Sequence, residues 1–218
     1  MNMDRQRLPI LWYIADPMCS WCWGFAPVIE RIKAVYGERM KIALLLGGLR
    51  PGSTEPLSAV LRAEILHHWH EVHQRTGQPF AFEDALPEGF VYDTEPPARA
   101  VIAVGAAEPG ATFAYFKAVQ SAFYTARRDV TRAEVLAGLA EPFGVDRALF
   151  LDRFESDDLR RRTQQHFRQS RELGVQGFPT AILQNAAGYA LLTSGWQPFD
   201  ELAPQIDEWL ASSPRYAS

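Results

Sequence analysis

The chain of 218 residues is 47% hydrophobic and carries a formal net charge of −4 at pH 7. This length suits one domain of ordinary size, or one domain with an insertion, and the mild acidity gives no reason to expect a nucleic-acid partner. No apolar run approaches the roughly 18 residues of a membrane helix, and the first residues lack the apolar core of a signal peptide. We therefore expect a cytoplasmic protein with no membrane or nucleic-acid partner.

The N-terminal quarter of the chain predicts a strand, a helix and a second strand. Residues 9–16 (PILWYIAD) and 40–49 (MKIALLLGGL) are short apolar runs typical of buried strands. Between them, residues 26–37 place apolar side chains at helical spacing, and Gly37 marks the end of that helix. The three elements form a βαβ unit, and both cysteines of the chain lie where its first strand meets its helix.

The middle and the end of the chain differ in pattern. Residues 56–171 show only helical periodicity, whereas residues 179–184 and 189–195 are apolar runs joined by a hairpin turn at 185–188. A closing amphipathic helix follows the hairpin. The order βαβ, helical block, ββα is that of the α/β thioredoxin-like fold with a large helical insertion. We predict a discontinuous thioredoxin-like domain of residues 1–55 and 172–218, with residues 56–171 as a helical insertion domain.

The only two cysteines of the chain, Cys19 and Cys22, lie in the stretch DPMCSWCWGF. Two cysteines are too few for a disulfide framework, so in a reducing compartment the C-x-x-C is either redox-active or half of a metal site. A structural zinc ion needs about four ligands, and there is no second C-x-x-C. The histidines of HHWHEVH (67–73) could in principle supply the others, but we interpret them as a solvated helix face or the rim of a groove, with contact to substrate as the alternative, and predict no metal.

The position of the cysteine pair predicts how it reacts. Cys19 at a helix N-terminus gains thiolate character from free N–H groups and the helix dipole, and Cys22 lies one turn inside on the same face. Cys19 is then the attacking residue and Cys22 the resolving one. The spacer residues Ser20 and Trp21 carry no charge, so we expect an intermediate reduction potential. Asp16 is interpreted as a polar turn residue rather than as a proton carrier.

Four motifs, DPMCSWCWGF, TGQPF, AFYTARRDV and GVQGFPT, resemble those of the DsbA-like thioredoxin superfamily. The resemblance is strongest to the bacterial branch of predicted protein-disulfide isomerases, near the FrnE-type proteins. It implies a protein disulfide oxidoreductase or isomerase that needs no external cofactor beyond its own redox-active disulfide. The implied partners are thiols and disulfides of partly unfolded proteins, with glutathione or a thioredoxin-type protein as redox partner.

The same resemblance implies a second half of the site. Pro179 matches the cis-proline that opens the third strand of thioredoxin-like folds and packs against the cysteines. Its neighbours Phe178 and Thr180 would then contact substrate together with Trp21, the Phe178 backbone pairing with an extended chain. Phe178 and Trp21 would also form an apolar collar around Cys19, which suits apolar segments of partly unfolded proteins.

Two other functions remain open on this scaffold. Kappa-class glutathione transferases and 2-hydroxychromene-2-carboxylate isomerases use bound glutathione, usually with serine at the position of Cys19 and no C-x-x-C. The two cysteines of this chain argue against that alternative. A chaperone-like binding module is the third reading, and it would work without either thiol. The direction of disulfide exchange, oxidation, reduction or isomerisation, is left open.

Overall fold

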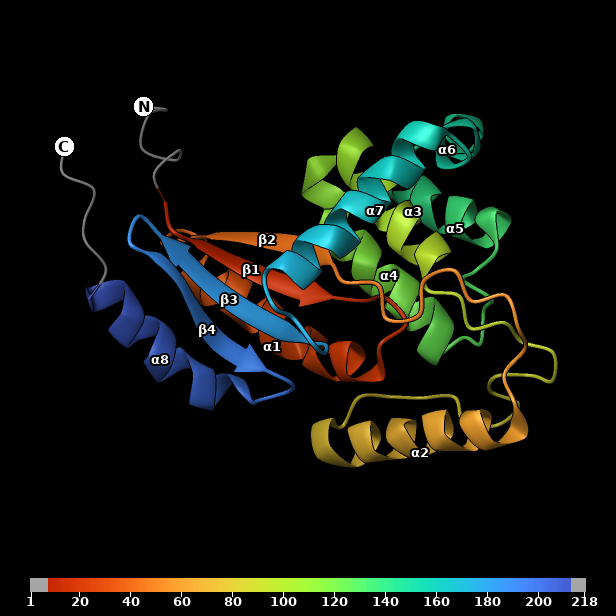
Figure 1. Cartoon of the computed structure of the whole chain (residues 1–218), viewed down its shortest axis with the longest axis horizontal. Coiled ribbons are helices and arrows are strands. Elements are labelled where there is room, and N and C mark those ends of the chain that lie inside the picture. The colour runs from red at the N-terminus through yellow and green to blue at the C-terminus, as the bar shows by residue number, and fades with distance from the viewer. Residues whose placement is uncertain (1–7, 213–218) are drawn as a thin grey trace.

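A four-stranded mixed sheet forms the centre of the thioredoxin-like part of the molecule (Figure 1). The computed structural model describes residues 8–212, so residues 1–7 and 213–218 at the outer ends of the predicted domain lie outside it. The strand order is β2-β1-β3-β4, with β1 parallel to β2 and antiparallel to β3, and β3 antiparallel to β4. The strands are β1 (Ile10–Ala15), β2 (Lys41–Leu46), β3 (Thr180–Asn185) and β4 (Gly188–Ser194).

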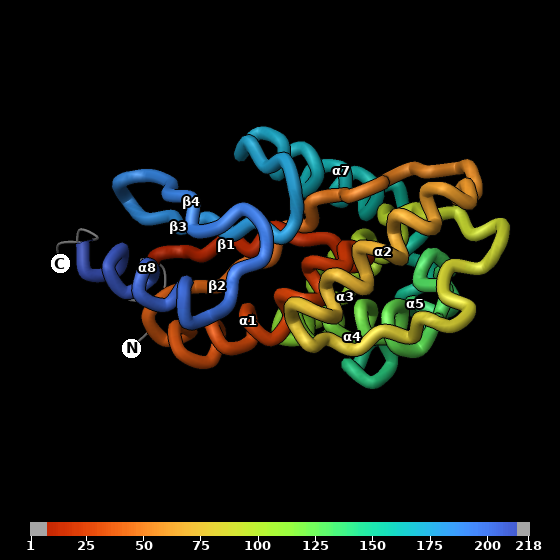
Figure 2. Tube along the Cα trace, turned by 90° about the horizontal axis from the view of Figure 1, so that it is seen from below, coloured from red at the N-terminus to blue at the C-terminus, as the bar shows by residue number. Residues whose placement is uncertain are grey.

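Helices cover the two faces of this sheet unequally. Helix α1 (Ser20–Tyr36) and helix α8 (Phe199–Ser212) lie on one face, while helix α7 (Asp157–Glu172) crosses the other face beside β2 (Figures 1 and 2). Leu46 donates its backbone N–H to Nδ1 of His166, which ties α7 to the end of β2 (3.3 Å). Burial and the nearby Arg162 lower the pKa of His166 to about 4, so its ring accepts this bond in the neutral form.

All the remaining helices lie between β2 and β3 in the chain, which confirms the expected fold class of a thioredoxin-like fold with a large helical insertion. They are α2 (Ala59–Thr76), α3 (Glu95–Ala107), α4 (Thr112–Tyr124), α5 (Ala133–Ala140) and α6 (Arg147–Phe154), with short 3-10 turns at Pro109–Ala111 and Glu141–Phe143. The domain boundaries at residues 55/56 and 171/172 stay a prediction.

One hydrophobic core runs from the sheet into the helical block. Tyr13 of β1 is fully buried and stacks on Phe25 of α1, with ring centroids 5.6 Å apart. The same ring meets Phe116 of α4 edge-on at 6.2 Å. Aromatic pairs in these geometries add about 0.5–1.5 kcal/mol beyond their burial. The contacts of Tyr13 therefore fix the start of α1 relative to both halves of the fold.

Helix α2 lies along the outside of the molecule and packs on α1 (Figure 2). Only Trp69 and Val72 of this helix are buried. The contact is close at Gly24 of α1, where a Cβ atom would come within 2.9 Å of the Val72 side chain. Glycine at this position therefore lets the two helices approach.

The loop after α2 compensates for a proline inside α1. Pro27 has no N–H, so the carbonyl of Trp23, four residues earlier, loses its helical partner. The side-chain amide of Gln78 donates to that carbonyl at 2.8 Å, and the Trp23 indole N–H donates to the Pro79 carbonyl at 2.9 Å. These bonds give the TGQPF motif a structural role, because they complete the hydrogen bonding of helix α1. Across residues 8–212, no helix is long and apolar enough to cross a membrane.

Candidate functional site

Cys19 and Cys22 occupy the first turn of α1. Cys19 is the N-cap residue, with extended backbone angles, and its carbonyl accepts from the N–H groups of Cys22 (3.0 Å) and Trp23 (3.1 Å). Both thiols are free. The exposed fraction is 6% for Cys19 and zero for Cys22. The Cys19 sulfur is therefore the one that a disulfide approaching from solvent can reach.

The start of β3 forms the opposite wall of the site. The peptide bond between Phe178 and Pro179 is cis, the isomer that the resemblance implied. The Cys19 thiol donates to the Phe178 carbonyl at 3.5 Å, across 159 positions of sequence. The Phe178 ring is partly buried against the loop that follows β2. Two segments far apart in the chain thus converge on one sulfur atom.

A groove of about 250 Å³ opens beside Cys19. Its walls come from the cysteine loop, the loop after β2, helix α2 and the start of β3. The residues that line it are Met18, Cys19, Ser20, Trp21, Leu49, Arg50, Ile65, His68, Trp69, Tyr92 and Phe178. Helix α2 therefore supplies a wall of the reactive site, and His68 lies at the groove, in agreement with the groove-rim interpretation of the histidines.

The Trp21 side chain is held by a cation. The Arg75 guanidinium carbon lies 5.4 Å from the ring centroid of Trp21 and 5.4 Å from that of Trp196. The Trp196 indole in turn donates to the Gly24 carbonyl at 3.1 Å. The uncharged Ser20–Trp21 spacer is thus in contact with a positively charged side chain of α2, at a distance typical of cation–π contacts.

Asp16 is fully buried, which the sequence interpretation as a turn residue did not anticipate. One carboxylate oxygen accepts from the Met18 N–H at 2.8 Å, the two-residue reach of an Asx turn. The other accepts from the Leu49 N–H at 2.7 Å and so joins the cysteine loop to the loop after β2. Burial raises the pKa of Asp16 to about 6, and the two N–H bonds only partly oppose this shift. Asp16 is a turn residue that also titrates near neutrality.

Burial also shifts the pKa values of other groups around the sulfurs. Burial raises the pKa of the Cys22 thiol well above its usual range, with further contributions from Cys19. Burial and the Asp16 charge raise the pKa of Tyr92, whose hydroxyl donates to the Met18 carbonyl. Tyr124, from the AFYTARRDV motif, is buried beside Tyr92 and has a raised pKa from burial. Cys22 therefore needs a proton acceptor nearby if it is to react as a thiolate.

The structure defines the surroundings of Thr180 and of the histidines of α2. The four histidines are exposed, as expected for a solvated helix face or groove rim. Thr180 was predicted to contact substrate, but it is 3% exposed and its hydroxyl donates to the Gly177 carbonyl at 2.8 Å, outside the groove. The histidines of α2 divide between different contacts: His67 and His68 with Glu71, His70 stacked on Phe82, and His73 on the Gln78 carbonyl. Over residues 8–212, no cluster of His, Cys, Asp and Glu has the grouping of a metal site.

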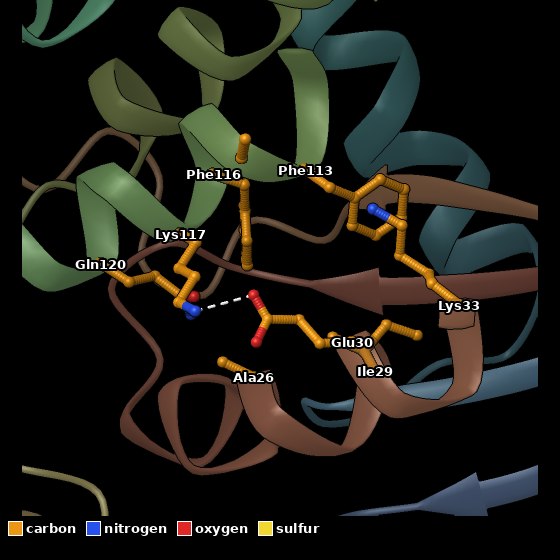
Figure 3. A pocket seen from close by; sticks show the side chains of 9 residues that line it. Ala26, Ile29, Glu30, Lys33, Phe113, Phe116, Lys117 and Gln120 are labelled. Atoms are coloured by element: carbon orange, nitrogen blue, oxygen red, sulfur yellow. Dashed lines mark hydrogen bonds and ion pairs between the residues drawn. The ribbon is translucent and has the colours of Figure 1, made fainter. Parts of the chain in front are cut away.

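A second hollow of about 110 Å³ lies between α1 and α4 (Figure 3). Glu30 and Lys117 form an ion pair across it, and Lys33 lies over the Phe113 ring with its ammonium 4.1 Å from the centroid. Gln120 is fully buried beside the hollow. Both cysteines lie outside this hollow, so the site of disulfide chemistry is the groove at Cys19.

Sequence reasoning brought Cys19, Cys22, Phe178 and Pro179 together, and the structure places these four residues in one site. Ser20 and Trp21 line the same groove. The residues that it missed come from the helical block and the loop after β2: Arg50, Trp69, Arg75 and Tyr92. No local pattern marks them, because each reaches the groove only through the packing of α2 and the loops around it.

Comparison with known proteins defines the class. The family model of the DSBA-like thioredoxin domain matches residues 12–207. The chain therefore belongs to the DsbA-like thioredoxin family, a family of thiol–disulfide oxidoreductases.

Individual relatives have the same fold over almost the whole chain. A protein from Nitrosomonas europaea, provisionally described as a protein disulfide isomerase, is 45% identical, with a TM-score of 0.89 over 94% of this chain and 98% of that one. The cytosolic disulfide reductase DsbM from Pseudomonas aeruginosa, solved with GSH, is 30% identical, with a TM-score of 0.72 over 93% and 96%. The ClpXP adapter protein SpxH from Halalkalibacterium halodurans is 20% identical over 97% of this chain and 71% of its own length.

Proposed function

We propose that this protein exchanges dithiols and disulfides through Cys19 and Cys22, with protein disulfides as substrates. The observation that carries the proposal is the contact between the Cys19 thiol and the Phe178 carbonyl, 3.5 Å apart. The less buried sulfur of the pair, at a helix N-terminus, and a backbone carbonyl beside it form the surface on which an extended cysteine-containing chain can pair. Ser20, Trp21 and Phe178 support that surface, and no external cofactor takes part.

Each half of the reaction has its own residue. A substrate disulfide meets the Cys19 thiolate, which forms a mixed disulfide and releases one substrate thiolate. Cys22 then attacks the Cys19 sulfur, which releases the second substrate thiolate and leaves the Cys19–Cys22 disulfide. Asp16, buried beside the pair with a pKa raised to about 6 by burial, supports removal of the Cys22 proton in this second step.

We propose reduction of disulfides as the direction, in the cytoplasm, with glutathione as redox partner. The similarity of this chain to the cytosolic disulfide reductase DsbM, solved with GSH, supports all three points. The uncharged Ser20–Trp21 spacer alone indicated an intermediate reduction potential, and the similarity to DsbM moves the expected potential toward the reducing end. Equilibration with glutathione tests it: a reduction potential near about −270 mV is expected, and one near about −120 mV would contradict reduction.

The reaction itself is tested by two cysteine variants. Cys22→Ser should accumulate a mixed disulfide on Cys19 when given a protein disulfide, whereas Cys19→Ser should accumulate none and should lose insulin reduction. Mass spectrometry under non-reducing conditions measures both. Glutathione-dependent isomerase activity that survives in Cys19→Ser would instead favour the glutathione-transferase alternative. Suppression of client aggregation that persists without either thiol, with no exchange activity in the wild type, would favour a chaperone.

A further inference from the structure

The groove beside Cys19 contains a guanidinium and no carboxylate. Its lining includes Arg50 and the His68 imidazole. In the hollow between α1 and α4, Lys33 and Lys117 lie with Glu30, and a third hollow, which also touches Trp69, contains two aspartates together with Arg127 and Arg128. The groove therefore differs from these two hollows because its cation has no carboxylate beside it in the lining.

Arg50 has a fixed backbone and an unpaired head group. Its N–H donates to the Thr94 hydroxyl at 3.0 Å, and its carbonyl accepts from the Thr94 N–H at 3.3 Å. Eight other arginine and lysine side chains of residues 8–212 form ion pairs, but no carboxylate of this part of the chain pairs with Arg50. A guanidinium held in this way is ready for a carboxylate from outside, which it can bind through two parallel hydrogen bonds.

Trp69 supplies a second unused donor. The side chain is 2% exposed, and its indole N–H has no acceptor among the described residues. Its ring is fixed between Phe80 (5.3 Å) and Tyr124 (5.0 Å), so the indole cannot swing out to solvent. A buried donor without a partner costs about 1–3 kcal/mol. An acceptor atom of a bound ligand would remove that cost.

His68 completes the set of polar groups. Its Nδ1 atom lies 3.0 Å from a carboxylate oxygen of Glu71 on the same helix, and this contact orients the ring. The Nε2 atom has no partner within the described residues. The polar groups of the groove are thus a guanidinium, an indole N–H and an imidazole, while Leu49, Ile65 and Phe178 make its apolar walls.

We propose that the groove selects low-molecular-weight disulfides that carry a carboxylate, with Arg50 as the group that binds the acid. The proposal rests on the disulfide exchange proposed above and adds a second substrate class to the protein disulfides named there. The groove volume of about 250 Å³ lies just below the roughly 300–1,000 Å³ of sites for drug-sized ligands, which favours a small substrate. The sequence had indicated an apolar collar for unfolded chains, and the Arg50 guanidinium adds a charged group beside that collar.

The two protein thiols supply both electrons and both protons for the reduction of such a disulfide. The Cys19 thiolate attacks one sulfur of the disulfide R–S–S–R, forms a mixed disulfide and expels the first RS⁻. The Cys22 thiolate then attacks Cys19, forms the Cys19–Cys22 disulfide and expels the second RS⁻. The protein dithiol loses two electrons and two protons, and the small disulfide becomes two RSH molecules. The carboxylate stays on Arg50 throughout and takes no part in bond changes.

Three small disulfides that differ in charge test the proposal: dithiodiglycolate (acidic), hydroxyethyl disulfide (neutral) and cystamine (cationic). For each disulfide, the second-order rate constant of its reaction with the pre-reduced full-length protein is measured. This rate constant is divided by the one for the reaction of the same disulfide with dithiothreitol, so that differences in intrinsic reactivity between the disulfides cancel. We expect the acidic disulfide to be preferred over the neutral one. Arg50→Gln should lower the normalised rate with dithiodiglycolate about tenfold and leave hydroxyethyl disulfide unchanged. Arg128→Gln, which removes the same charge from another hollow, should keep the preference.

Equal normalised rates for the three disulfides, or a preference unchanged in Arg50→Gln, would overturn the proposal while leaving the disulfide exchange intact. Binding provides a readout that does not depend on turnover. Calorimetry with the Cys19→Ser/Cys22→Ser variant should detect dithiodiglycolate more strongly than hydroxyethyl disulfide, and adding Arg50→Gln should remove the difference. If the wild type reduces no disulfide, the proposed function fails, and this binding difference still decides whether the groove recognises an acid.

Discussion

The Phe178 ring lies directly against the backbone of Gly47. A Cβ atom on Gly47 would come within 1.9 Å of Cε1 of that ring, a distance at which something must move. The contact joins the loop after β2 to the residue that precedes the cis-proline, and its partner atoms come from segments that lie 131 positions apart in the sequence. The position of Phe178 in the groove thus depends on the absence of a side chain at Gly47.

Substitution of Gly47 should therefore disturb both stability and reactivity. Gly47→Ala is expected to destabilise the fold by about 1–3 kcal/mol through overpacking and to displace Phe178 from the groove. Urea unfolding and the rate of hydroxyethyl disulfide reduction measure the two effects. Gly177→Ala is the matched control, because a Cβ there meets nothing within 4 Å. In a Phe178→Ala background the cost of Gly47→Ala should shrink, and an unchanged cost would show that the ring is not the obstacle.

Asp16 should make stability fall as pH rises through the acid range. Its folded-state pKa of about 6 lies above the ordinary value of 3.8, so the folded state holds the proton more tightly. The resulting stabilisation is complete below about pH 4, is lost as pH rises to about 6, and amounts to about 3 kcal/mol. Urea unfolding of the wild type and Asp16→Asn from about pH 4 to about pH 7 checks this. A stability difference between them that does not change with pH would contradict it.

His166 should have the opposite pH dependence. Its folded-state pKa of about 4 lies below the ordinary value of 6.5, because burial and Arg162 disfavour the charged ring. Its contribution is complete above about pH 6.5 and is lost as pH falls toward about 4, by roughly 1–3 kcal/mol for this partly exposed group. His166→Asn keeps an acceptor for the Leu46 N–H without the titration, so it should lack this loss. Direct titration of the ring by NMR gives the pKa, and a value near 6.5 would contradict the prediction.

The contact of Arg75 with Trp21 should affect the reactivity of the site more than its stability. Arg75→Gln removes a cation between two indoles, a contact worth about 0.5–1 kcal/mol per ring at exposed sites. We expect a small loss of stability and a fall of roughly two- to fivefold in the rate of disulfide reduction, because Trp21 is no longer held beside Cys19. Arg31→Gln removes a comparable contact, with Phe199, on another part of the molecule. Equal rates in the two variants would show that the Trp21 contact has no role in the reaction.

Much of the fold follows from local patterns in the sequence. The apolar runs at 9–16 and 40–49, the helix between them and the C-terminal hairpin each depend on side chains close together in the chain, and all were found where expected. The resemblance then supplied what spacing alone could not, the convergence of GVQGFPT on the cysteines. The role of Thr180 in contacting substrate stays a prediction, and the bond from its hydroxyl to the Gly177 carbonyl is a local contact that the motif did not reveal.

The chemistry around the sulfurs depends on packing between distant segments. The sequence alone determined the order of the elements and the positions of the two cysteines at the start of α1, since these depend on adjacent residues and their periodicity; the nucleophilic and resolving roles of Cys19 and Cys22 stay predictions. Only the tertiary structure decided that Asp16 is buried, that Arg50 and Trp69 line the groove, and that Gln78 replaces the hydrogen bond that Pro27 cannot make. The physical reason is that burial and hydrogen-bond pairing are properties of the folded surroundings. The sequence around a charged group, an indole N–H or an amide is the same whether that group bonds to water or to a residue 50 positions away. Local sequence therefore does not reveal the partner.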